Sequence, residues 1–197
     1  MLYGNRDKFD KVSKKIGRVF SKIAVTPSQW TVLSLIPSFF GFYYIAIEMD
    51  LLIAAVFLVF AAFFDLVDGA VARYKNTVSK NGAYLDTITD RYVEFLFIFG
   101  LFFVSLPRIY FSSEIWLSLI LFGSLATTYS KSAAKEKEVT GEEIRGGLLE
   151  RAERVMLLLL SLTLGSFNLT WMVYVLIVIA VLSNISALQR IYSALNS

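Results

Sequence analysis

The chain contains neither cysteine nor histidine among its 197 residues. Without cysteine it can form no disulfide framework, no thiolate zinc site and no thiol nucleophile. Without histidine, any catalytic base has to be a carboxylate, a lysine or a tyrosine. Charged residues are also scarce, at 18% against about 25% in an ordinary soluble domain. These absences exclude thiol-dependent and histidine-dependent enzymes.

Apolar side chains are abundant instead and make up 56% of the residues. An ordinary soluble domain has about 45–50%, and a helix that spans a bilayer needs roughly 20 mostly apolar residues. The length predicts one domain, residues 1–197. We therefore expect an all-α integral membrane protein with a six-helix transmembrane bundle over residues 28–192. The expected spans are Ser28–Ile47, Leu51–Tyr74, Ala83–Leu106, Ile115–Tyr129, Glu150–Phe167 and Trp171–Tyr192.

Residues 7–23 carry apolar side chains at helical spacing, with lysines and arginines at most other positions. This pattern predicts an N-terminal amphipathic helix in the membrane interface beside anionic lipid. If the N-terminus faces the cytoplasm, every lysine and arginine except Arg108 lies on the cytoplasmic side. The positive-inside rule therefore predicts a multi-pass cell-membrane protein in that orientation. Pro37 predicts a kink in the first span.

Four aspartates lie toward the cytoplasmic ends of the second and third spans. Asp65 and Asp68 are three residues apart, and Asp86 and Asp90 are four apart, so each pair shares one face of its helix. The short connection between the spans makes the two helices antiparallel neighbours. The four carboxylates are therefore expected to meet at one depth, and ionisable side chains in membrane helices mark function by default.

Four clustered carboxylates repel one another in a low dielectric unless protons or cations neutralise them. Oxygen ligands without histidine or cysteine favour a hard divalent ion, Mg²⁺ or Mn²⁺. Two such ions would form the clamp used in phosphoryl displacement. Salt bridges are the alternative for one or two of the aspartates, with these candidate partners: Arg73, Lys75 and Arg91.

Gly69 directly follows Asp68, and Gly82 opens the third span. Because glycine inside a helix costs about 1 kcal/mol relative to alanine, two of them need a physical reason. Close approach of a planar base or a diphosphate to the backbone supplies one, and Arg73 can hold a diphosphate oxygen through charge-assisted bonds. Tight helix packing at Gly69 and a turn at Gly82 are the alternatives.

The whole segment reads Asp65-Leu-Val-Asp68-Gly69-Ala-Val-Ala72-Arg73, with Gly82, Asp86 and Asp90 following. It resembles the signature D-x2-D-G-x2-A-R-x8-G-x3-D-x3-D of the CDP-alcohol phosphotransferase family at every fixed position. The resemblance implies a homodimeric membrane enzyme with an amphipathic helix and six spans. It also implies transfer of a phosphate-linked lipid from a CDP-lipid to an alcohol, with release of CMP. Where the family usually has asparagine after the proline at position 27, this chain has Ser28.

The same resemblance assigns roles to individual residues. Asp65, Asp68 and Asp86 would ligate two Mg²⁺ or Mn²⁺ ions. Asp90 would help to hold the metal and would act as the base that deprotonates the incoming hydroxyl. The residues implied to bind the CDP-lipid are Thr31, Asp68, Gly69, Ala72, Arg73 and Gly82.

Several basic residues lie at cytoplasmic helix ends and suit a phosphorylated acceptor, because arginine binds phosphate bidentately. The sequence elements that contain them, Tyr-x-Lys, Glu-Arg-x-Glu-Arg and Gln-Arg, resemble those of the family branch that makes phosphatidylinositol phosphate and archaetidylinositol phosphate. This implies CDP-diacylglycerol or CDP-archaeol as donor and inositol phosphate as acceptor. The residues assigned to the acceptor phosphate are Lys131, Arg151, Arg154 and Arg190. Plain positive-inside flanking, or pairing with Glu150 and Glu153, is the alternative for each.

Other functions are also open at this point. Glycerol phosphate or serine could be the acceptor, or CDP-inositol the donor. Intramembrane prenyl transferases also use aspartates and Mg²⁺ on diphosphates, but they lack the Asp-Gly-x2-Ala-Arg spacing. A divalent-cation transporter would place its carboxylates near the bilayer midplane. No nucleic-acid partner is expected.

Overall fold

The computed structural model describes residues 6–139 and 147–196, and side chains from residue 12 onward. These residues form helices without a β-sheet, which confirms the all-α prediction. The helices are α1 (Arg6–Phe20), α2 (Pro27–Leu33), α3 (Leu35–Ala46), α4 (Leu51–Tyr74), α5 (Lys80–Leu101), α6 (Ser113–Glu136), α7 (Arg151–Gly165) and α8 (Leu169–Leu195).

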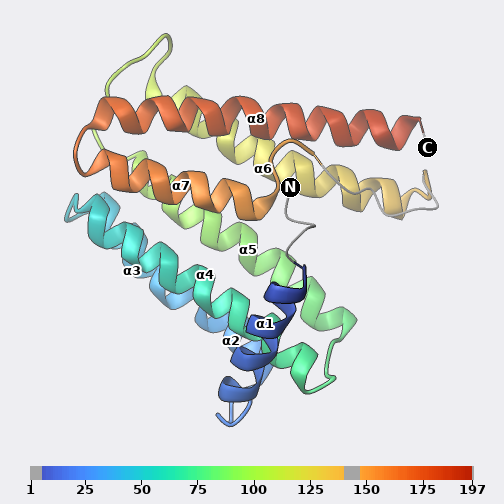
Figure 1. The fold of residues 1–197 in the computed structure, drawn as a ribbon. Coiled ribbons are helices and arrows are strands. Elements are labelled where there is room, and N and C mark those ends of the chain that lie inside the picture. The colour runs from blue at the N-terminus through green and yellow to red at the C-terminus, as the bar shows by residue number, and fades with distance from the viewer. Residues whose placement is uncertain (1–5, 140–146, 197) are drawn as a thin grey trace.

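The helices pack in two groups (Figure 1). α6 and α7 lie along α8, and α3, α4 and α5 form an inclined layer beneath them, joined to the first group through contacts of α4 with α7 and of α5 with α6. An apolar core runs between these helices and includes the fully buried Phe97, Leu117, Leu162 and Leu176. Within the described residues, α4 and α8 are the helices long and apolar enough to cross a membrane. The count of six spans therefore stays a prediction.

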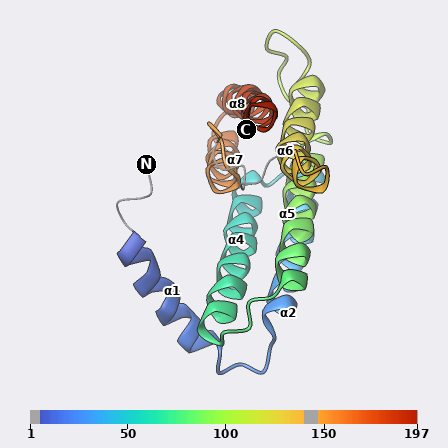
Figure 2. The ribbon, with the colours of Figure 1, turned by 90° about the vertical axis from the view of Figure 1, so that its right-hand side faces the viewer.

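α1 lies outside this bundle, on the side of α4 away from α5 (Figure 2). The two helices approach closely at Gly17, where an added Cβ would lie 2.6 Å from the carbonyl oxygen of Ala70. Phe20 packs into a small apolar cluster formed by α2 and α4. Val12 and Val19 are exposed. The apolar stripe of the predicted amphipathic helix is thus divided between α4 and the outer surface.

The first expected span is two helices, interrupted at Ser34, three residues before Pro37. Thr26 caps α2 through a reciprocal pair of hydrogen bonds with Gln29, and Pro27 occupies the first turn, where its missing N–H costs nothing. Pro37 lies in the first turn of α3. Because a proline removes the hydrogen bond to the residue four positions earlier and clashes with its carbonyl, the backbone is interrupted on the N-terminal side of the proline.

Two other boundaries differ from expectation by five residues or more. The third span was expected to continue to Leu106, but α5 ends at Leu101, and Pro107 disfavours helical backbone just before it. The fourth was expected to end at Tyr129, but α6 continues to Glu136 through alanine, lysine and glutamate, which are good helix formers. Residues 140–146 of the polar connection that follows lie outside the described residues.

Candidate active site

Three of the four signature aspartates converge between α4 and α5. Carboxylate oxygens of Asp65, Asp68 and Asp86 all lie within 4.8 Å of one another. Asp68 is buried, while Asp65 and Asp86 are half-buried. An all-oxygen donor set at this spacing fits a hard divalent cation, since Mg²⁺ and Ca²⁺ both prefer carboxylate ligands. We call these three residues the carboxylate cluster.

Asp90 joins the cluster through an arginine. Arg151, the first residue of α7, places its Nη1 2.8 Å from Asp65 Oδ2 and its Nη2 2.5 Å from Asp90 Oδ1. One guanidinium therefore bridges α4 and α5 and holds the start of α7 against both. Arg151 was assigned to the acceptor phosphate and not to the aspartates, so it is an addition to the partners considered from the sequence.

Thr31 connects α2 to the cluster. Its hydroxyl donates to Asp68 Oδ2 at 2.5 Å and also lies 3.2 Å from the Pro27 carbonyl oxygen. Thr31 is 5% exposed and Asp68 6% exposed, so the contact is shielded from solvent. A hydrogen bond to one carboxylate oxygen fixes the side chain and leaves the second oxygen for a ligand.

A cavity of about 600 Å³ opens between α2, α4 and α5 beside the cluster. Asp86 contributes to its wall, together with polar residues of the α4–α5 connection. Every residue that the sequence assigned to the CDP-lipid also lines it: Thr31, Asp68, Gly69, Ala72, Arg73 and Gly82. Residues from three helices, as far apart in the chain as Pro27 and Asp86, thus face one space.

The two signature glycines border this cavity without packing against a neighbouring helix. The atoms nearest to an added Cβ at Gly69 belong to the Arg73 guanidinium, the closest at 3.1 Å. At Gly82 the nearest atom is Ser79 Oγ, also at 3.1 Å, and Ser79 caps α5 by accepting from the Gly82 N–H. Tight helix packing therefore does not explain Gly69.

The four cations assigned to the acceptor lie in different surroundings. Arg151 reaches the aspartates, as described above. Arg190 on α8 donates from Nη1 to the Thr127 carbonyl oxygen at 2.9 Å. Lys131 lies half-buried on α6. Arg154 is only 3% exposed and is held in the interior.

The partner of Arg154 is Glu94, which the sequence analysis missed. Glu94 is 4% exposed and forms ion pairs with Arg154 and, at 2.8 Å, with Arg91. Ser124 donates to the same carboxylate at 2.7 Å. The available signal was its position, four residues after Asp90 on the same face of α5. Glu94 is thus the centre of a buried polar network that joins α5 to α6 and α7.

α8 holds the backbone that leads into α7. The N–H of Leu148 donates to Gln189 Oε1 at 3.0 Å, and the N–H of Leu149 donates to Ser186 Oγ at 2.8 Å. These bonds fix the residues just before Arg151. The guanidinium beside the aspartates is therefore positioned from α8 as well as from its own helix.

Comparison with known proteins identifies relatives over nearly the whole chain. Residues 24–188 match the family model described as CDP-alcohol phosphatidyltransferase. The archaetidylinositol phosphate synthase of Pyrococcus horikoshii is 30% identical over 98% of this chain and 96% of its own length. The phosphatidylinositol phosphate synthase of Mycolicibacterium smegmatis is 27% identical, covering 98% of this chain and 87% of its own.

Solved structures share the fold. The crystal structure of Mycobacterium tuberculosis phosphatidylinositol phosphate synthase with CDP-DAG bound superposes with a TM-score of 0.78, 25% identity and coverage of 93% of this chain and 94% of that one. The same enzyme in complex with manganese and citrate gives a TM-score of 0.79, also at 25% identity, over 92% and 88% of the two chains.

Proposed function

Because the chain belongs to the CDP-alcohol phosphatidyltransferase family, we propose that it transfers the phosphatidyl or archaetidyl group of a CDP-lipid to the hydroxyl of inositol phosphate and releases CMP. The donor is CDP-diacylglycerol or CDP-archaeol. The observation that carries this proposal is the single cavity that contains Asp68 and Asp86 together with every residue assigned to the CDP-lipid. The relatives named above make phosphatidylinositol phosphate or archaetidylinositol phosphate, which supports inositol phosphate as the acceptor.

We propose that the carboxylate cluster and Asp90 hold two Mg²⁺ or Mn²⁺ ions. Carboxylate oxygens within 4.8 Å of one another provide a suitable donor set, and a solved relative contains manganese. When bound, such ions neutralise the charge that develops on the leaving CMP phosphate. Thr31 orients Asp68 for this task through their hydrogen bond.

The remaining steps fall to side chains around the cavity. Arg73 holds the diphosphate. Gly69 and Gly82 have no side chain, which leaves room for the nucleotide against the backbone. Asp90 accepts the proton of the attacking hydroxyl, as a general base does. Arg151 lies within 2.5 Å of Asp90, so an acceptor phosphate bound by Arg151 would bring its hydroxyl close to that base.

The other acceptor cations divide by position. Lys131 lies on α6 and Arg190 on α8, the helix that packs against both α6 and α7. Arg154 is held by Glu94 in the interior, and from there it fixes the turn of α7 that carries Arg151. In this arrangement Lys131 and Arg190 bind the acceptor phosphate together with Arg151, and Arg154 supports them.

We further propose a single six-span domain in the cell membrane, with α1 in the interface and the N-terminus and active site facing the cytoplasm. The apolar α4 and α8 and the distribution of lysine and arginine support this arrangement. The resemblance to the family supports a homodimer.

The test is an assay of CMP release by the detergent-purified protein. CDP-archaeol or CDP-diacylglycerol is supplied with Mg²⁺ or Mn²⁺, and inositol phosphate, glycerol phosphate and serine are offered separately. We expect CMP with inositol phosphate, its loss on chelation, and its return when either metal is restored. CMP with serine or glycerol phosphate alone would assign a different acceptor. No CMP with any alcohol, combined with Mn²⁺ uptake by reconstituted vesicles, would favour transport instead.

A further inference from the structure

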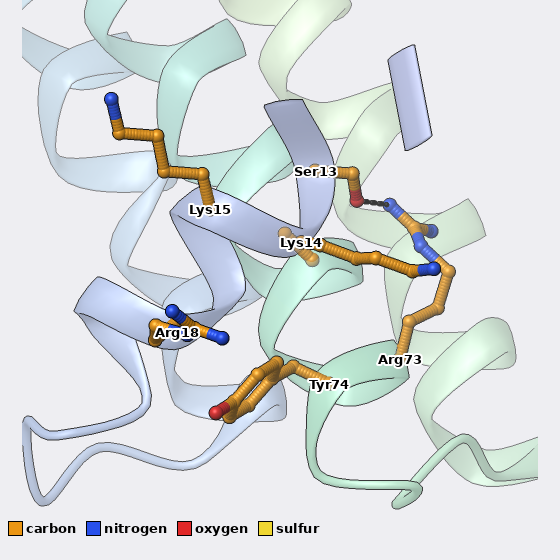
Figure 3. Close-up of a pocket in the computed structure, with 7 residues that line it drawn as sticks. Ser13, Lys14, Lys15, Arg18, Arg73 and Tyr74 are labelled. Carbon is orange, nitrogen blue, oxygen red and sulfur yellow. Dashed lines mark hydrogen bonds between the residues drawn. The ribbon is translucent and has the colours of Figure 1, made fainter. Parts of the chain in front are cut away.

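A second cavity of about 600 Å³ lies between α1 and the last turn of α4 (Figure 3). Its wall contains four basic side chains and two hydroxyl groups, and the described residues that line it include no acid. The polar lining residues are Ser13, Lys14, Lys15, Arg18, Arg73 and Tyr74. Cations gathered without acidic partners repel one another, so an anion would stabilise this arrangement.

The cavity depends on the close approach of the two helices at Gly17, where an added Cβ would also lie 2.7 Å from Tyr74 Cβ. Across this contact, Arg73 Nη2 donates to Ser13 Oγ at 2.9 Å. In Figure 3, the side chain of Lys14 extends toward Arg73, and Arg18 lies near Tyr74. Donor groups from both helices therefore line one solvent-exposed space, and they do not belong to α1 alone.

Arg73 lines this cavity and also the larger cavity beside the aspartates. Apart from Arg73, the lining residues of the two cavities differ. None of the four cations assigned to the acceptor phosphate lines the second cavity. An anion bound there would therefore not be the acceptor, and Arg73, which we propose holds the donor diphosphate, would be shared between the two cavities.

We propose that the cavity between α1 and α4 is a phosphate-binding site. Guanidinium and ammonium groups with nearby hydroxyl donors are the groups that bind phosphate oxygens. Two sources can supply that phosphate: the headgroup of an anionic lipid, or a soluble phosphate. The exposed Val12 and Val19 on the same helix place the site next to an apolar surface, where a lipid headgroup would be available.

The experiment measures binding and needs no catalysis, so it is independent of the proposed reaction. Native mass spectrometry of the purified full-length protein measures retention of phosphatidylglycerol against zwitterionic phosphatidylcholine, and calorimetry measures binding of inorganic phosphate. The test variant is Lys14→Gln with Arg18→Gln. The matched control is Lys22→Gln with Lys80→Gln, which removes two exposed charges that line neither cavity. Size-exclusion chromatography checks that both variants are folded.

We expect the wild type and the control to bind, and the test variant to lose about fivefold in affinity for each charge removed. The charge-keeping variant Lys14→Arg with Arg18→Lys should restore binding. Selective retention of phosphatidylglycerol would assign a lipid source, and binding of inorganic phosphate without lipid selectivity would assign a soluble one. Absence of both, full binding by the test variant, or equal loss in test and control would overturn the proposal.

Discussion

At the scale of single residues, the hydrogen bond from Thr31 fixes the orientation of the Asp68 carboxylate, which we propose binds a metal ion. We expect Thr31→Val to raise the Mn²⁺ concentration needed for half-maximal CMP release by about 10–100-fold, because loss of such an orienting hydrogen bond weakens metal sites to that extent. Metal titrations of the purified variant measure the effect.

Thr163 provides the matched control for this change. Its hydroxyl donates to the carbonyl oxygen of Leu159, four residues earlier, and Thr31 Oγ1 likewise lies 3.2 Å from the carbonyl oxygen of Pro27. Thr163 lies on α7, however, and lines neither cavity described above. Thr163→Val should leave the metal requirement unchanged. An equal shift in both variants would mean that the effect comes from the helix and not from Asp68.

Asp90 and Asp68 are both signature aspartates, but they have different neighbours. Their asparagine variants should therefore distinguish a general base from a residue that binds metal and substrate. Asp90 contacts Arg151, whereas Asp68 lines the cavity that holds the residues assigned to the CDP-lipid. Asp90→Asn should lower turnover by about 10²–10⁴-fold, the usual contribution of a general base, while CDP-lipid binding is mostly kept. Asp68→Asn should weaken binding as well. Equal loss of binding in both variants would remove Asp90 from the base role.

The residues of the cavity were assigned to the CDP-lipid through the resemblance to the family signature, whereas spacing alone predicted only which aspartates share a helix face. Asp65 and Asp68, three apart on one helix, need only the helical period to share a face. The pairing of Arg151 with Asp65 joins residues 86 positions apart, and it depends on which helices pack together. Glu94 was missed for the same reason, since nothing near it in the chain reveals Arg154 as its partner.

At the scale of helices, the network around Glu94 fastens α5 to α6 and α7 beneath the aspartates. Glu94→Gln removes one partner of a buried charge and leaves Arg154 uncompensated, which costs about 3–5 kcal/mol in comparable cases. We therefore expect a marked fall in the thermal midpoint of the detergent-solubilised protein, with CMP release lost at lower temperature.

The control for this prediction is Glu136→Gln on α6. Glu136 pairs with Lys137 at 3.1 Å, but both side chains are about 70% exposed, and such surface pairs contribute only about 0–1 kcal/mol. Its thermal midpoint should stay close to that of the wild type. A similar fall of the thermal midpoint in both variants would show that the Glu94 network contributes no more to stability than an exposed ion pair does.

Helix boundaries were harder to predict than the existence of the helices. Apolar runs located the second to sixth segments, but α6 continues seven residues past the apolar run that predicted it. The extra residues are helical because they are good helix formers, whereas the predicted end of the helix was based on hydropathy alone. The break at Ser34 is caused by Pro37. It lies in the turn before the proline because the proline ring clashes with the carbonyl four residues earlier.

At the scale of the whole molecule, the six-span arrangement requires α7 to cross the bilayer. Its 15 residues rise about 22 Å at 1.5 Å per residue, less than the roughly 30 Å of a hydrocarbon core. α7 nevertheless packs along α8, whose 27 residues are long enough to cross. If α7 crosses the bilayer together with α8, residues 166–168, which connect the two helices, lie at the outer surface.

The natural absence of cysteine makes this arrangement testable by site-specific labelling. Lys137 and Phe167 are both exposed. They follow α6 and α7, whose C-terminal ends lie at opposite ends of the bundle (Figure 1). In sealed vesicles, a membrane-impermeant maleimide should label Lys137→Cys only from the cytoplasmic side and Phe167→Cys only from the other side. Labelling of both from one side would show that α7 returns to the same surface, and the six-span arrangement would then be wrong. Reversed sidedness of both would keep the spans but place the carboxylate cluster on the outer face, away from cytoplasmic CDP-lipid and inositol phosphate.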